Sequence, residues 1–296
     1  MTQTQIIGPS IAVIVPNHND SRHLPRCLRS ILSQTVVPDE LIVVDDKSTD
    51  DSVAVIRSLI AGHRHAQLVE NPVNLGVYRA VDEGLKRSRS EYVLFLAAND
   101  FVLPGIFARA KACLARAPGV GLWSAMAWIV DENDNPVRLH LSPVVALSDA
   151  VLAPSRCVEL AQRLGGWFTG TTLVYRRSAL EAIGRFDPAY MGLSDLISAL
   201  IVASREGAAF TPEPLAVVRM HAGSYLFAKT LGNPEVLEGI LEHLRASAPR
   251  YAPELFSPAF LERTSKRFRF ASIRATEGAA VAAVAARSSG WARRLL

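Results

Sequence analysis

Polar side chains that can bind a ligand or a metal directly follow three apolar stretches of the chain. The stretches are residues 11–15, 41–44 and 92–96, and the polar groups after them are Asn17-His18-Asn19, Asp45-Asp46 and Asn99-Asp100. Carboxylate and amide oxygens accept hydrogen bonds from bound molecules and are the ligands that Mg²⁺ prefers in proteins. One polar loop after a strand is a common turn, whereas three such loops favour a binding site. The predicted chemistry is therefore recognition of a polar ligand, with or without a cation.

The elements that position these side chains are predicted to alternate between strand and helix. Residues 92–96 form a continuous apolar run, as expected for a strand covered on both faces. Strand-like and helical patterns alternate four times in about the first hundred residues, which is typical of βαβ units and a parallel sheet. In an open α/β sheet, ligands bind beyond the carboxyl ends of the strands. We therefore expect the three polar loops at one edge of the sheet.

Further elements are predicted from the same patterns. Strands are expected over residues 67–70, 121–130, 172–175 and 215–220. Helices are expected over residues 23–32, 51–59, 77–87, 106–117, 153–164, 178–183, 194–205 and 234–246. Because the composition shifts near residue 226, we predict an α/β domain over residues 1–226 and a helical, basic C-terminal extension over residues 227–296.

The composition limits the class of protein. Hydrophobic residues make up 49% of the 296 residues and charged residues 20%, as in a globular chain. The net charge of +4 is too diffuse to indicate nucleic-acid binding but suits an anionic ligand or an acidic membrane surface. The 3 cysteines are far apart and are predicted to be free thiols in a reducing compartment. Since no signal sequence and no apolar run of ~18 residues is recognised, we expect a cytoplasmic protein.

The order and spacing of several motifs resemble family 2 glycosyltransferases of the GT-A fold. The segments that carry the resemblance are residues 11–20, 28–35, 40–52, 74–76, 91–96, 184–188, 195, 212–215 and 219–221. The resemblance implies an α/β, Rossmann-like and mostly parallel sheet flanked by helices. It also implies transfer of a sugar from a nucleotide diphosphate donor to an acceptor hydroxyl.

The resemblance assigns a donor-binding role to seven residues. They are Pro16, His18, Asp45, Asp46, Arg79, Ala98 and Asn99. The loop with Pro16 and His18 is expected to touch the base, Asp46 to accept a hydrogen bond from the base, and Arg79 to contact a phosphate. Plainer interpretations stay open, because Asp45 and Asp46 could cap the following helix and His18 could be an ordinary loop histidine.

The resemblance also assigns catalytic and acceptor roles. Asp195 matches the general base, and a carboxylate suits this role because an acceptor hydroxyl must lose its proton as it attacks the sugar. Asp195 could instead be a carboxylate favoured by the positive end of a helix dipole. Trp167 follows a Gly-Gly pair in a loop and is expected either to stack on the acceptor or to lie in the core. His221 matches a histidine that approaches the metal or the diphosphate, with a structural role as the alternative.

The motif that holds a metal in most relatives is altered in this chain. The family pattern is Asp-x-Asp-Asp, whereas this chain has Ala97-Ala98-Asn99-Asp100. Ala97 cannot bind a cation, and Asn99 keeps an oxygen but lacks the charge. Affinity for Mg²⁺ or Mn²⁺ is therefore expected to be weakened.

Three interpretations of this change stay open. A metal could still be held by Asn99, Asp100, His221 and the donor phosphates. Cationic side chains could replace the metal, and the candidates are Lys47, Arg79 and Arg219. Alternatively, catalysis has been lost, leaving a catalytically impaired nucleotide- or glycan-binding protein of the same fold.

The resemblance therefore implies a hexosyltransferase-like, inverting enzyme of polysaccharide biosynthesis at the cell envelope, with a glycan or lipid-linked acceptor. The basic, aromatic segment 263–274 is expected either to pack as an amphipathic helix or to dock peripherally at the inner face of a membrane. No nucleic-acid partner is expected. A dinucleotide-binding dehydrogenase is excluded because no Gly-x-Gly-x-x-Gly follows Val15.

Overall fold

The computed structural model describes residues 8–220 and 226–292, which belong to two compact units. The first unit comprises the residues up to 186 together with residues 198–219. The second comprises residues 187–197 and the residues from 220 onward. The predicted division at residue 226 differs from these units, because it assigns residues 187–197 and 220–226 to the first domain, and it stays a prediction.

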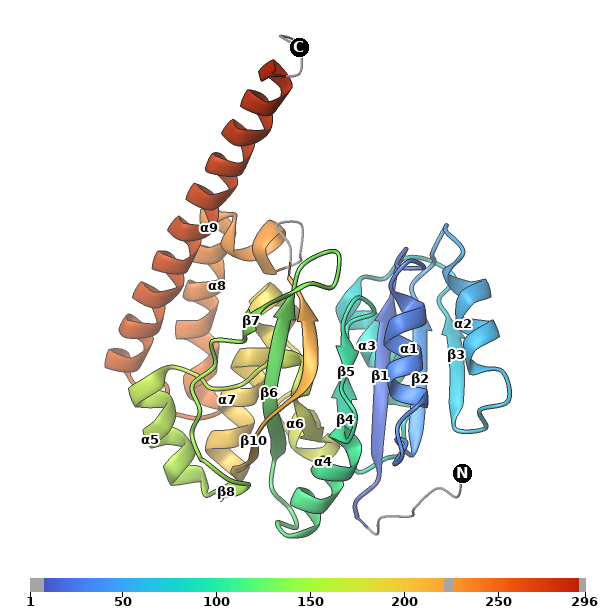
Figure 1. The fold of residues 1–296 in the computed structure, drawn as a ribbon. Helices are drawn as coiled ribbons and strands as arrows, with labels where there is room; N and C mark the ends of the chain where they lie inside the picture. The colour runs from blue at the N-terminus through green and yellow to red at the C-terminus, as the bar shows by residue number, and fades with distance from the viewer. Residues whose placement is uncertain (1–7, 221–225, 293–296) are drawn as a thin grey trace. The chain divides into compact units, whose positions relative to one another are not determined.

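Four parallel strands form one half of the sheet in the first unit (Figure 1). They are β1 (Ile11–Asn17), β2 (Glu40–Asp45), β3 (Ala66–Glu70) and β4 (Tyr92–Phe95), in the spatial order β3-β2-β1-β4. Asn17 pairs in register with Asp45. The carboxyl ends of these strands consequently meet at one edge, as the alternating pattern predicted.

The other half of the sheet is mixed. Its strands are β5 (Phe101–Val102), β6 (Leu122–Val130), β7 (Pro136–Leu139), β8 (Ala150–Leu152), β9 (Val174–Arg176) and β10 (Ala208–Arg219). The order continues from β4 as β9-β6-β10-β5, with β7 beside β6 and β8 beside β10. β10 runs parallel to β6, whereas β9 is antiparallel to both β4 and β6.

Helices cover both faces of this sheet. The helices are α1 (Leu24–Leu32), α2 (Ser52–Ile60), α3 (Val77–Arg87), α4 (Ile106–Ala115), α5 (Pro154–Leu164), α6 (Arg177–Ala182) and α7 (Ser194–Glu206). Because side chains alternate across a strand, Val13 and Val15 join the core that includes α1 and α4, while Ile14 points at α3. The predicted α/β architecture, a largely parallel sheet flanked by helices, is confirmed.

The strand predicted over residues 215–220 is longer than its pattern suggested. β10 begins at Ala208 and passes through two prolines, which lack the N–H that a regular ladder requires. The register against β6 shifts between Thr211 and Pro214 and again between Pro214 and Ala216. These irregularities accommodate the prolines, and they hid the first half of the strand from the sequence pattern.

The second unit is helical. Its described elements are η2 (Pro188–Leu193), the first residues of α7, η3 (Phe227–Leu231), α8 (Pro234–Ser247), η4 (Ala248–Arg250) and α9 (Pro258–Ala292). Asp187 accepts a hydrogen bond from Nε2 of His243 at 2.6 Å, which ties the segment before α7 to α8. The expectation of helices at the C-terminus is confirmed. Over residues 8–220 and 226–292, no helix combines the length and the apolar character that a membrane span requires.

Candidate functional site

The carboxylate of Asp45 closes the loop between β2 and α2. One of its oxygens accepts from Nδ2 of Asn17 at 2.8 Å and from Oγ of Ser48 at 2.5 Å, and the other accepts from the Ser48 amide at 2.9 Å. Asp45 and Asn17 are both buried. Oδ1 of Asn17 is also buried and has no hydrogen-bond partner among the described residues. Asp45 therefore joins the ends of β1 and β2.

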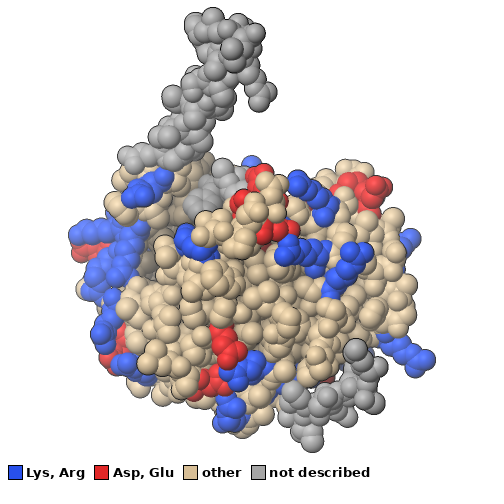
Figure 2. All heavy atoms as spheres, viewed as in Figure 1, with Lys and Arg blue, Asp and Glu red and all other residues tan. Residues whose placement is uncertain are grey.

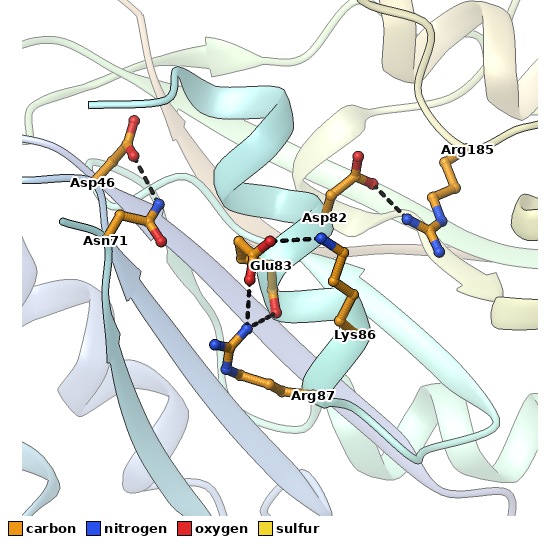
Figure 3. A network of polar contacts seen from close by, with 7 residues as sticks. All are labelled: Asp46, Asn71, Asp82, Glu83, Lys86, Arg87 and Arg185. Atoms are coloured by element: carbon orange, nitrogen blue, oxygen red, sulfur yellow. Dashed lines mark hydrogen bonds and ion pairs between the residues drawn. The ribbon is translucent and has the colours of Figure 1, made fainter. Parts of the chain in front are cut away.

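The carboxylate of Asp46 organises the loop that leads into α3. It accepts from Nδ2 of Asn71 at 2.8 Å (Figure 3). It also accepts from the Leu75 amide at 2.9 Å and from the Gly76 amide at 2.7 Å. Gly76 has φ of 83°, a conformation that glycine adopts without steric cost. A single buried carboxylate thus positions residues 71–76 beside the end of β2.

His18 links the loop after β1 to the loop before α3. Its Nδ1 donates to the Asp46 carbonyl at 2.8 Å, and its Nε2 accepts from Nδ2 of Asn74 at 3.1 Å. The ring is exposed, and Pro16 beside it is half-buried. The structure therefore brings Pro16, His18, Asp45 and Asp46 together at the ends of β1 and β2.

The segment after β4 turns its side chains alternately outward and inward. Ala97 is exposed, Ala98 is buried, Asn99 is half-buried and Asp100 is buried. The two carboxylate oxygens of Asp100 accept separately from Oγ1 of Thr171 at 2.9 Å and from the Arg219 amide at 2.8 Å. Burial raises the pKa of Asp100 to about 6, against the effect of these hydrogen bonds.

A guanidinium group lies against the segment that carries Asn99. Arg219, the last residue of β10, donates from its guanidinium to the Asn99 carbonyl and forms an ion pair with Asp134. Asp134 also pairs with Arg26 of α1, whose guanidinium lies 3.8 Å from the centre of the Phe101 ring. Sequence patterns indicated Arg219, but not Arg26 or Asp134.

The described side chains at this end of the sheet do not form a donor set for Mg²⁺ or Mn²⁺. Both oxygens of Asp100 already accept hydrogen bonds, Asn99 carries no charge, and the guanidinium of Arg219 lies against this segment, where it would repel a metal cation. Within residues 8–220 and 226–292, no three His, Cys, Asp or Glu side chains form a group that could hold a metal. The predicted ligand His221 lies outside the described residues.

Two further residues predicted on the donor side lie at exposed positions. Arg79 is exposed in the first turn of α3, and Lys47 is exposed with φ of 63°.

The acidic residues of α3 are paired with cations (Figure 3). Asp82 meets Arg185 at 3.3 Å, and Glu83 pairs with Lys86 at 2.6 Å and with Arg87 at 2.7 Å.

The predicted acceptor and base residues lie elsewhere in the chain. Trp167 is only 1% exposed, and its ring packs against Phe168 with centroids 4.3 Å apart. Stacking of Trp167 on a sugar would require the ring to move, and its acceptor role stays a prediction. Asp195 belongs to the second unit, in the first turn of α7, where it accepts from the Leu196 amide at 2.7 Å. Burial raises the pKa of Asp195, and its role as general base stays a prediction.

Comparison with known families and sequences gives consistent matches. The family described as "Glycosyl transferase family 2" matches residues 12–184, which is more than half of the chain. An uncharacterised protein of Mycobacterium tuberculosis is 29% identical over 73% of this chain and 69% of its own length. An uncharacterised glycosyltransferase of Nostoc is 31% identical over 60% of this chain, which spans 54% of that relative. A poly(ribitol-phosphate) beta-glucosyltransferase of Bacillus spizizenii is 30% identical over 31% of this chain and 15% of its own length.

Two solved structures share the fold. TarS residues 1–349 of S. aureus, in complex with UDP, align with a TM-score of 0.64 and 16% identity over 88% of this chain and 70% of that chain. The mannosyltransferase PcManGT of Pyrobaculum calidifontis, in complex with GDP-Man and Mn²⁺, aligns with a TM-score of 0.62 and 22% identity over 98% of this chain and 81% of that chain. At these identities the likeness is one of fold, and it supports the predicted GT-A architecture.

Proposed function

The chain belongs to glycosyl transferase family 2 and is therefore a nucleotide-sugar-dependent glycosyltransferase. We propose that it moves a sugar from a nucleoside diphosphate to a hydroxyl of a glycan or lipid-linked acceptor. The observation that carries this proposal is the cluster at the ends of β1 and β2. There Asp46, His18 and the loop of residues 71–76 are held together by hydrogen bonds. An arrangement that is rigid before the ligand arrives suits recognition of a nucleotide base, since binding then orders fewer side chains.

The residues at the ends of the strands are proposed to bind the nucleotide-sugar donor. The loop with Pro16 and His18 meets the base, and the Asp45–Asp46 pair keeps this loop and the next one in place. Ala98 and Asn99 face the ribose and the phosphates, and Arg79 reaches the phosphates from α3. The ligands of the two solved relatives, UDP and GDP-Man, support a nucleoside diphosphate donor and leave the base open.

The proposed reaction is a single displacement with inversion. The carboxylate of Asp195 takes the proton of the acceptor hydroxyl as that oxygen forms a bond to the anomeric carbon. The bond from this carbon to the diphosphate oxygen breaks on the opposite side, and the nucleoside diphosphate leaves with the electron pair. Burial raises the pKa of Asp195, which makes its carboxylate a stronger base.

Replacement of Asp195 by Asn tests this assignment. We expect Asp195→Asn to lower turnover at least about a hundredfold, as is usual when a general base is lost. Binding of UDP or GDP, measured by calorimetry, is expected to stay within about threefold of the wild type, because the nucleotide is recognised at the strand ends. Full turnover by Asp195→Asn would rule out the assignment.

A catalytically impaired nucleotide-binding or glycan-binding protein is the second candidate, favoured by the loss of two motif carboxylates at Ala97 and Asn99. Measurement of donor consumption with UDP-sugars and GDP-sugars separates the two functions. Tight binding of UDP or GDP by the wild type, with neither transfer nor hydrolysis of any donor across a panel of glycan acceptors, would favour this candidate.

The acceptor is proposed to belong to the cell envelope. The name of the Bacillus relative, a poly(ribitol-phosphate) beta-glucosyltransferase, supports an envelope polymer as the acceptor class. We also propose that α9 brings the enzyme to the inner face of a membrane, where lipid-linked acceptors are made. The exposed basic and apolar side chains of this helix support the contact.

A further inference from the structure

Arg219 lies against residues 97–100, the segment that resembles the metal-binding motif of the family in an altered form. Its guanidinium donates to the carbonyl of Asn99, and its amide donates to the carboxylate of Asp100. The two motif positions that would carry carboxylates are Ala97 and Asn99, neither of which has a negative charge. A permanent cation therefore lies beside a segment whose one acidic residue, Asp100, already accepts hydrogen bonds on both oxygens.

We propose that Arg219 supplies the positive charge for the donor diphosphate in place of a divalent cation, and that Asp134 is the positioning residue that holds Arg219. The inference rests on the proposed function, because it presupposes a diphosphate at this edge of the sheet. A guanidinium suits the task, since it stays charged at any working pH and its donors match phosphate oxygens in geometry.

The first support is that Arg219 is both fixed and incompletely bonded. Its side chain is only 3% exposed, and it is anchored by Asn99 and Asp134. Its Nε is buried, however, and has no hydrogen-bond partner in the described part of the chain. A buried donor without an acceptor is unfavourable, so a ligand oxygen that reached Nε would gain a bond without displacing an existing one.

The second support is the way Asp134 is built into its turn. Asp134 lies between β6 and β7 with φ of 66°, a conformation that few side-chain-bearing residues adopt. Oδ1 of Asp131 accepts from the Asn133 amide at 2.8 Å and from the Asn135 amide at 2.9 Å, which fixes the turn around Asp134. The hairpin is thus shaped to present one carboxylate to Arg219.

The third support is the balance of charge. Asp134 pairs with two cations, Arg219 and Arg26, and the carboxylate of Asp100 accepts from the backbone amide of Arg219 rather than from its guanidinium. Burial by itself raises the pKa of Asp134, but the hydrogen bonds from the guanidinium groups of Arg219 and Arg26 together outweigh it and lower the pKa, which favours the ionised carboxylate. The guanidinium of Arg219 can attract a diphosphate, whose own charge grows as the sugar leaves.

Comparison of diphosphate and nucleoside binding tests the proposal. We would titrate the protein with UDP, GDP, uridine and guanosine by calorimetry. Each titration would be run once in buffer that contains EDTA and once in buffer that contains Mn²⁺. For the wild type we expect whichever of UDP and GDP has the higher affinity to bind with the same affinity in EDTA and in Mn²⁺. For Arg219→Gln we expect diphosphate affinity to fall at least about tenfold with nucleoside affinity unchanged, because only the phosphates meet the guanidinium.

Two further variants separate positioning from general damage. Asp134→Asn is expected to weaken diphosphate binding about threefold to tenfold in the same selective way, and Arg219→Lys to recover part of the loss. The matched control is Asp149→Asn, since Asp149 also bridges two arginines, Arg109 and Arg116. Asp149→Asn is expected to leave both affinities unchanged. Should Arg219→Gln fail to fold, the Asp134→Asn and Arg219→Lys comparison decides the question.

The outcomes distinguish this inference from the proposed function. Loss of diphosphate binding in EDTA with recovery in Mn²⁺ would overturn the inference, and so would equal losses of nucleoside and diphosphate affinity in Arg219→Gln and Asp134→Asn. In both cases the proposed function would stand. If neither nucleoside diphosphate bound the wild type under any condition, the proposed function would fail and the inference with it.

Discussion

At the scale of single residues, two adjacent aspartates perform different tasks. Asp45 joins the ends of β1 and β2, whereas Asp46 binds the amides of the loop before α3. An asparagine at position 46 would keep one acceptor oxygen and place an NH₂ group among N–H donors. We expect Asp46→Asn to lower the free energy of unfolding by about 1–3 kcal/mol, and to weaken UDP or GDP binding about tenfold, because the loop loses its anchor.

Chemical denaturation and calorimetry measure these two effects. The control is Asp51→Asn, because Asp51 is exposed at the start of α2 and its side chain makes no capping hydrogen bond. Its stability is expected to stay within about 0.5 kcal/mol of the wild type. If Asp46→Asn kept the stability and the nucleotide affinity of the wild type, contacts other than the Asp46 carboxylate would be holding the loop of residues 71–76.

Sequence patterns located the candidate residues better than they located the partners of those residues. His18, Asp46 and Asn99 could be placed after strands because apolar runs are visible locally. Asn71 and Asn74, which bond to Asp46 and His18, could not be chosen from the polar residues of their loop. Such pairs depend on how separate loops meet in space. Trp167 shows the same limit, because a tryptophan after two glycines fits either a site or a core.

At the scale of elements, the packing of α3 on β1 depends on a glycine. A methyl group at Gly84 would lie 2.4 Å from Cγ2 of Ile14, a buried branched side chain with little rotational freedom. We expect Gly84→Ala to lower the free energy of unfolding by about 1–3 kcal/mol, because overpacking outweighs the better helix propensity of alanine. Because α3 follows the loop that Asp46 anchors, nucleotide affinity is expected to fall as well.

Gly239 of α8 is the matched control for this prediction. It lies inside a helix, is exposed and has no neighbour within 4 Å of an added methyl group. Gly239→Ala is therefore expected to raise stability by up to about 1 kcal/mol, through helix propensity alone. Denaturation curves of the two variants give the comparison. If both variants showed the same increase in the free energy of unfolding, α3 would tolerate displacement from β1.

The elements themselves could be predicted where their pattern is local. The alternation of β1 to β4 with α1 to α3 follows from periodicity, and these elements position the donor-side residues. β5, β7 and β8 contain only 2 to 4 residues each and exist through pairing with β6 or β10. Short strands of this kind carry too little pattern to be recognised, so the hairpin that presents Asp134 could not be foreseen.

At the scale of the whole molecule, the proposed membrane contact rests on one exposed face of α9. Residues 263, 266, 267, 270, 273 and 274 recur at helical spacing and are all exposed. Four of them are basic, one of which, Lys266, pairs with Glu262 at 2.8 Å, and the other two are Phe270 and Ile273, which are 62% and 53% exposed. Lys and Arg side chains gather over α9 in Figure 2. The other side of the helix faces its own unit, where Ser265 bonds to Arg245 and Ser272 donates to the Leu231 carbonyl.

A vesicle assay decides whether this face meets a membrane. We expect the protein to sediment with vesicles that contain phosphatidylserine and not with phosphatidylcholine alone, since each basic residue adds about 1 kcal/mol near an anionic surface. Replacing Phe270 and Ile273 by Ser should weaken binding at least about tenfold, because each apolar side chain that enters the bilayer contributes about 1.5–3 kcal/mol. Val137→Ser is the control, since Val137 is 59% exposed on β7 and lies outside this face. Activity on a soluble acceptor should be the same in all three proteins, because α9 is proposed to deliver the enzyme to its acceptor rather than to take part in the transfer. Vesicle binding that persisted in the double variant, or that ignored lipid charge, would remove α9 from the proposal and leave the transferase assignment intact.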